Sequence, residues 1–123
     1  MSYDIRLGVK VDGAKDLYAV VDEPKLASPT YNLGQMFRKC TGWNYEQGKW
    51  YKVSDVLPLI QHGIQELSCH PSVYKKYNAP NGWGTVESAL EALKSMEKCI
   101  RDNSEGASIT WNEIPLDLMY IRW

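Results

Sequence analysis

Polar and apolar residues alternate near the start of the chain. From residue 3 to residue 11 every odd position is apolar, whereas Asp4, Arg6 and Lys10 occupy even positions. This period of two predicts a half-buried strand. Asp12-Gly13 then indicates a turn, and residues 17 to 21 predict a second strand. We expect the two strands to pair as an antiparallel hairpin.

A helical pattern follows the connector that carries Pro24 and Pro29. Asn32 is a favourable N-cap residue, and Gln35 stands three positions later, as in a capping box. We expect a short helix from Leu33 to about residue 40 that stops near Gly42. Its inner face would consist of Met36, Phe37 and Cys40.

The middle of the chain predicts a loop and two further helical segments. Residues 43 to 51 are rich in aromatic side chains and predict a loop or loose turn. Ser54 is expected to cap the next helix, whose apolar residues keep a helical spacing as far as Leu67. Pro71 ends that helix and can begin a short helical turn.

The longest helical pattern runs from Val86 to Ile100. Thr85 precedes it as an expected cap, and its apolar positions lie on one face. Leu90 and Leu93 are therefore expected in the core. A strand is expected around residues 109 to 111.

The chain ends in Leu118-Met119-Tyr120-Ile121-Arg122-Trp123, which is apolar on both faces except at Arg122. Such a strand is either buried within the domain or paired with another chain. We favour the subunit contact, which predicts a homo-oligomer. The whole pattern predicts an α+β fold, in which a small antiparallel sheet packs against three to four helices. The N-terminal hairpin and the C-terminal strand or strands would form this sheet.

Composition narrows the class of protein. The 123 residues fit one domain, 1–123, and a formal net charge of −1 argues against general nucleic-acid binding. No apolar run is long enough to span a membrane, and the N-terminus lacks the layout of a signal peptide. We therefore expect a cytoplasmic protein. The three cysteines, an odd number, are expected to be reduced core thiols.

Two motifs carry a resemblance to a known group. Asn32-Leu33-Gly34-Gln35-Met36 opens the first predicted helix, and Lys76-Tyr77-Asn78-Ala79-Pro80-Asn81-Gly82-Trp83-Gly84 precedes the longest one. Their order resembles a group of small uncharacterised proteins of bacteriophages and prophages, over residues 30 to 100. The resemblance implies a small accessory or counter-defence protein in the host cytoplasm. It implies no particular chemistry.

Both motifs stand at predicted helix starts, where free backbone N–H groups and the positive end of the helix dipole suit an anion. The asparagines add amide groups, the aromatic residues add flat faces, and the glycines let a ligand approach the backbone. If the two helix starts converge, they would form a ligand site from Tyr31, Asn32, Arg38, Asn81, Gly82, Trp83 and Gly84. The alternative is structural: Asn32 only caps, Asn81 only turns, and Trp83 packs on the core.

Catalytic and metal chemistry find little support. His62, Cys69 and His70 match no zinc spacing, and no serine or cysteine stands in a nucleophile motif. We therefore expect no cofactor and do not classify the chain as an enzyme.

Two functions remain open, beside a hydrolase whose catalytic carboxylates the sequence does not identify. The first is a non-catalytic binder that sequesters a small anionic or nucleotide-like ligand. The second is an inhibitor that contacts a host protein through an aromatic surface, which the five Trp and eight Tyr residues favour.

Overall fold

A computed structural model of the chain describes residues 3–13, 17–24, 31–79, 84–104 and 114–123. Its four strands form one antiparallel sheet in the order β2-β1-β4-β3. The predicted hairpin and C-terminal strand are confirmed. The third strand was predicted as part of a loop. The strands are β1 (Arg6–Lys10), β2 (Tyr18–Asp22), β3 (Trp50–Lys52) and β4 (Met119–Arg122).

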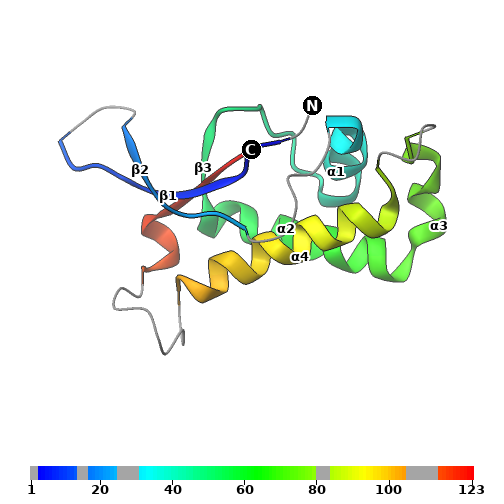
Figure 1. Cartoon of the computed structure of the whole chain (residues 1–123). Coiled ribbons are helices and arrows are strands. Elements are labelled where there is room, and N and C mark those ends of the chain that lie inside the picture. Colours follow the sequence, from blue (N-terminus) through cyan, green and yellow to red (C-terminus); the bar gives the residue numbers. More distant parts are fainter. Residues whose placement is uncertain (1–2, 14–16, 25–30, 80–83, 105–113) are drawn as a thin grey trace.

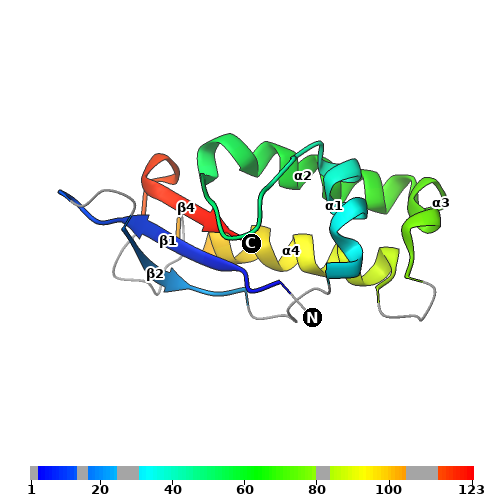
Figure 2. The same cartoon turned by 90° about the horizontal axis from the view of Figure 1, so that it is seen from above.

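Helices cover one face of this sheet and extend beyond it (Figure 1). The two long helices, α2 and α4, run side by side, and α1 crosses them beyond the end of β4 (Figure 2). The predicted α+β fold is therefore confirmed. The helices are α1 (Gly34–Thr41), α2 (Val53–Cys69), α3 (Pro71–Tyr74) and α4 (Val86–Asp102). Short 3₁₀ turns are η1 (Tyr31–Leu33), η2 (Lys75–Tyr77) and η3 (Leu116–Leu118).

Two predicted caps are wrong and one is confirmed. Asn32 lies inside η1, so Leu33 holds the N-cap position of α1. Ser54 lies in the first turn of α2 because β3 runs directly into this helix at Val53. Thr85 does cap α4: its hydroxyl accepts from the Ser88 N–H at 3.2 Å, and its own N–H donates to Ser88 Oγ at 2.8 Å.

The C-terminal strand lies in the interior of the sheet. β4 pairs with β1 on one side and with β3 on the other, and Trp123 is 2% exposed. Both edges of β4 are therefore already hydrogen-bonded. The prediction that this strand forms a subunit contact is wrong, and its two-sided apolar character reflects burial within the domain.

The helical core forms where α1, α2 and α4 meet. A Cβ atom added at Gly63 of α2 would lie 2.6 Å from Thr41 Cγ2 and 2.9 Å from Leu93 Cδ1, so the three helices approach closely at this point. Leu93 is fully buried, as predicted, whereas Leu90 is only half-buried at the rim of the core. The predicted strand around residues 109 to 111 lies outside the described residues.

The difference between the two leucines can be measured. Leu93→Ala should lower the free energy of unfolding by about 2–5 kcal/mol, because it leaves a cavity between packed helices. Leu90→Ala is the matched control and should cost less than about 2 kcal/mol, since part of its side chain is already in water. Urea titrations of both variants provide the test, and equal losses would contradict this packing of α4.

Candidate functional site

The aromatic side chains of the described residues form two groups at the sheet and a separate pair, Tyr74 and Tyr77. One group is buried between the sheet and α1, around Trp123. The Trp123 ring stacks on Tyr45, with ring centroids 4.1 Å apart, and lies 4.9 Å from Phe37. Tyr45 also donates a hydrogen bond to the Tyr3 hydroxyl at 2.9 Å. We call this group the inner cluster; it consists of Tyr3, Phe37, Trp43, Tyr45, Tyr51 and Trp123.

The second group lies on the opposite face of the sheet. Residues that are paired across antiparallel strands share a face, and neighbours along a strand alternate. Leu7 and Ile121 pair on the helix side and are buried. The residues that alternate with them therefore point away from the helices. Cross-strand pairing arranges these outward-pointing residues in three rows. The first row is Trp50, Arg122 and Arg6, the second is Lys52, Tyr120, Gly8 and Val20, and the third is Lys10 and Tyr18.

Three rings meet on this outer face. The tip of the Trp50 indole lies over Gly8, where an added Cβ would be 2.8 Å from its Cη2 atom. Trp50 therefore reaches across β4 and stacks on Tyr18, with ring centroids 4.9 Å apart and planes 15° apart. Tyr120 meets the Tyr18 ring edge-on at 5.0 Å. All three side chains remain partly exposed, so part of their aromatic surface is accessible to solvent.

Basic side chains surround these rings. The Arg122 guanidinium lies 5.4 Å from the centroid of the Trp50 ring. Arg6 forms ion pairs with Asp4 at 3.0 Å and Glu23 at 3.2 Å. Lys10 on β1 and Lys52 on β3 are exposed. Neither lysine forms an ion pair with a described residue.

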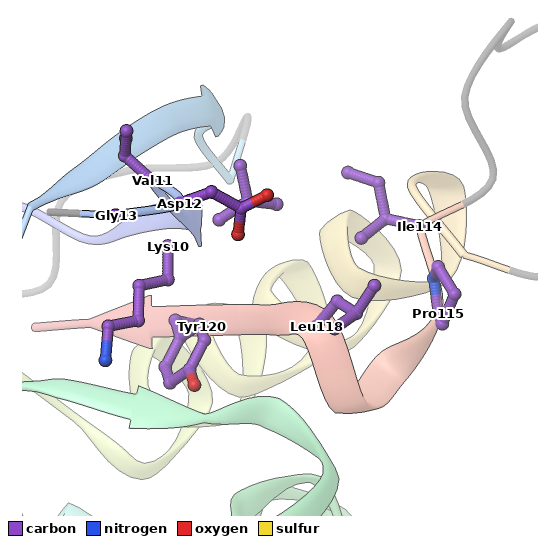
Figure 3. Close-up of a pocket in the computed structure, with 9 residues that line it drawn as sticks. Lys10, Val11, Asp12, Gly13, Ile114, Pro115, Leu118 and Tyr120 are labelled. Carbon is purple, nitrogen blue, oxygen red and sulfur yellow. The ribbon is translucent and has the colours of Figure 1, made fainter.

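A cleft of about 680 Å³ opens at the end of this outer face. It lies between the end of β1 and the segment that leads into β4, and its walls are mainly apolar (Figure 3). Lys10 and Tyr120 belong both to the cleft and to the outer face. The Asp12 carboxylate points toward the opening between the two segments (Figure 3). An anionic group would therefore be held at Lys10 and not deeper in the cleft.

The predicted helix-start site lies largely beyond what the structure describes. Asn81, Gly82 and Trp83 fall outside the described residues, as does the side chain of Tyr31. Asn32 is exposed in η1. Gly84 is buried with a φ of 147°, and its carbonyl accepts from the Ala79 N–H at 2.9 Å. This bond joins Ala79 to Gly84, two residues before α4, which is a structural role for Gly84.

Arg38 has intramolecular partners. Its guanidinium lies 4.2 Å from the centroid of the Tyr45 ring, and its Nη2 donates to the Tyr45 carbonyl at 3.3 Å. Gly34, one turn earlier, leaves room for this side chain, because an added Cβ would lie 3.0 Å from Arg38 Nη1. Arg38 thus joins α1 to the segment that carries Tyr45.

Burial affects two titratable groups of the core, Cys40 and Tyr45. Burial raises the pKa of the Cys40 thiol to about 12, so this cysteine is a poor nucleophile at neutral pH. Burial also raises the pKa of the Tyr45 hydroxyl, which donates to Tyr3. Within the described part of the chain, no group of three or more His, Cys, Asp or Glu residues is placed to hold a metal ion.

Comparisons with known proteins add no family. The chain matches no protein-family model, and no curated protein or solved structure is significantly similar to it. The resemblance to phage proteins therefore stays a prediction. Among the described residues, no helix has the length and apolar character needed to cross a membrane. The outer face of the sheet is the arrangement from which a function can be argued.

Proposed function

We propose that this chain is a non-catalytic binding protein that holds a nucleotide-like, anionic ligand on the outer face of its sheet. The observation that carries this proposal is the group of three rings, Trp50, Tyr18 and Tyr120, with exposed lysines on both sides. Aromatic faces stack on any planar base, and Lys side chains attract phosphate as point charges. Binding by stacking and charge requires no catalytic group.

The phage resemblance supports a use for such binding. A small accessory protein of a phage can act against a host defence by sequestering a nucleotide-like signal. The helix starts that carry Asn32 and Asn81 remain an alternative location for the same ligand. Variants at the two locations distinguish them.

An NMR titration with adenosine and thymidine monophosphates at millimolar concentration tests the proposal. We expect the amide signals of β1 and β4 on the outer face to shift. Trp50→Ala should weaken binding by about 1–3 kcal/mol, the usual contribution of one base–aromatic stack. Lys10→Gln should weaken it less, because it removes one exposed charge and leaves the rings in place.

Lys94→Gln is the matched control, since Lys94 is an exposed lysine on α4 that forms no ion pair with a described residue. It should bind like the natural chain. Shifts concentrated at Asn32 and Arg38, together with lost binding in Asn32→Ala, would move the site to the helix starts. No shift with either nucleotide at the outer face or at the helix starts would refute the proposed function.

A protein partner is the second candidate, favoured by exposed apolar side chains on β2 and at the residue just before it. Leu17, Val20 and Val21 are 53%, 50% and 38% exposed, and β2 is an edge strand of the sheet. An exposed apolar edge strand is a template for pairing with another chain. A host protein or a second copy would suit this edge, so the predicted homo-oligomer is now proposed to form here.

Light scattering across a range of protein concentrations tests self-association. The natural chain should exceed the monomer mass at high concentration, and Val20→Lys should restore the monomer by placing a charge at the edge. Leu118→Lys is the control, because Leu118 is similarly exposed, at 58%, but lies in η3. A monomer mass for the natural chain at every concentration would exclude the homo-oligomer and leave the edge to a host partner.

A further inference from the structure

We infer that the outer face of the sheet binds a single strand of nucleic acid in preference to a free nucleotide. This inference rests on the proposed function and specifies its ligand. It depends on the shape of the face, on the positions of its cations and on its local charge.

The shape of the face suits an extended ligand. The three rings belong to β3, β2 and β4, and the Trp50 side chain crosses two neighbouring strands to reach Tyr18. Four strands at their usual spacing of about 4.8 Å span roughly 14 Å, which is wider than one base. Sites for small molecules are concave and enclose most of the ligand. Trp50 and Tyr18 are presented on the open sheet, and Tyr120 also lines the cleft, so the rings suit a chain of bases that stack in succession.

The two exposed lysines stand on opposite sides of one ring. Lys52 is the cross-strand partner of Tyr120 on β3, and Lys10 lies two residues beyond Gly8, the partner of Tyr120 on β1. The strands β1 and β3 are about 9.6 Å apart by strand spacing, and Lys10 lies two residues further along β1. A base on Tyr120 would therefore have one cation on each side. A single strand supplies a phosphate before and after each internal base, whereas a monophosphate supplies only one.

The local charge of the face differs from that of the whole chain. The formal net charge of −1 is unsuited to a protein that binds nucleic acid by overall charge. Among the described residues, the face carries Arg6, Lys10, Lys52 and Arg122, whereas Asp4 and Glu23 pair with Arg6 and Asp12 lies at the cleft beside Lys10. Four positive and three negative groups give a local surplus of one positive charge. This surplus is small, so stacking must supply much of the affinity.

Stacking on exposed rings requires unpaired bases. In a duplex the flat faces of the bases are covered by their neighbours, so the rings of this face could not reach them. Single strands expose these faces and are bound by aromatic side chains with little regard to sequence. We therefore expect DNA and RNA single strands to bind and duplexes of the same length to bind much more weakly.

Fluorescence anisotropy with labelled oligothymidylates tests the inference. A dodecamer should bind more tightly than a tetramer, and unlabelled thymidine monophosphate should compete only weakly. Trp50→Ala should weaken dodecamer binding by about 5- to 150-fold, the equivalent of one lost base stack. If two phosphates are contacted, the logarithm of affinity should fall against the logarithm of salt concentration with a slope near about −1.4.

Charge variants make the test specific. Lys10→Gln and Lys52→Gln should each reduce the magnitude of the salt slope by about 0.7, while Lys94→Gln on α4 should leave it unchanged. Circular dichroism would reveal whether Trp50→Ala impairs folding. In that case the exposed variants Lys10→Gln and Lys52→Gln still test the inference.

The outcomes separate the two proposals. Thymidine monophosphate that competes as well as the dodecamer would overturn this inference and leave the proposed function intact. A duplex that binds as tightly as the single strand, or lysine variants that all behave like Lys94→Gln, would also overturn it. Failure of the dodecamer and of both nucleotides to bind would refute both proposals.

Discussion

The packing of the C-terminal Trp123 in the inner cluster is the interaction on which the rest of the structure depends. Its ring stacks on Tyr45 at 4.1 Å and contacts Phe37 of α1, and its carbonyl accepts from the Gly48 N–H at 3.1 Å. Since Trp123 directly follows β4, the central strand is fixed to α1 and to the segment that leads into β3. Burying large aromatic rings stabilises a small domain strongly, because each ring removes much apolar area from water.

This arrangement uses aromatic residues in two different ways on the two faces of one sheet. Apart from the half-buried Tyr51, the inner cluster is buried against the helices, so its rings are unavailable to a ligand. The outer rings, Trp50, Tyr18 and Tyr120, contact one another but remain partly exposed. Gly8 makes this possible, because any side chain there would collide with the Trp50 indole. A rigid, helix-backed sheet thus presents an aromatic surface to solvent, and we propose that this surface is where binding occurs.

The sequence predicted those helices and strands that are determined by the residues within them or next to them. The spacing of apolar residues in α4 and the Thr85 cap were visible, and so was the N-terminal alternation. β3 was missed because its three residues, Trp50–Lys52, are too few to show an alternation of apolar and polar positions. Their extended conformation depends on pairing with β4. The central place of β4 also depends on distant partners. The outer face could not be predicted for the same reason: the aromatic excess was visible, but only the strand register brings Tyr18, Trp50 and Tyr120 together. Of the site predicted at the helix starts, Asn81 and Trp83 lie outside the described residues, and Arg38 contacts Tyr45.

Hydrogen–deuterium exchange measured residue by residue tests most directly whether the C-terminal strand holds the fold together. Chain ends usually fray, and their amides exchange early. Here β4 is bonded on both sides and followed by the buried Trp123, so we predict that its amides, from Met119 to Arg122, are among the slowest to exchange. Their opening free energy should approach that of global unfolding, while the edge strand β2 exchanges faster. Exchange of β4 as fast as that of β2, with α4 still protected, would contradict this account.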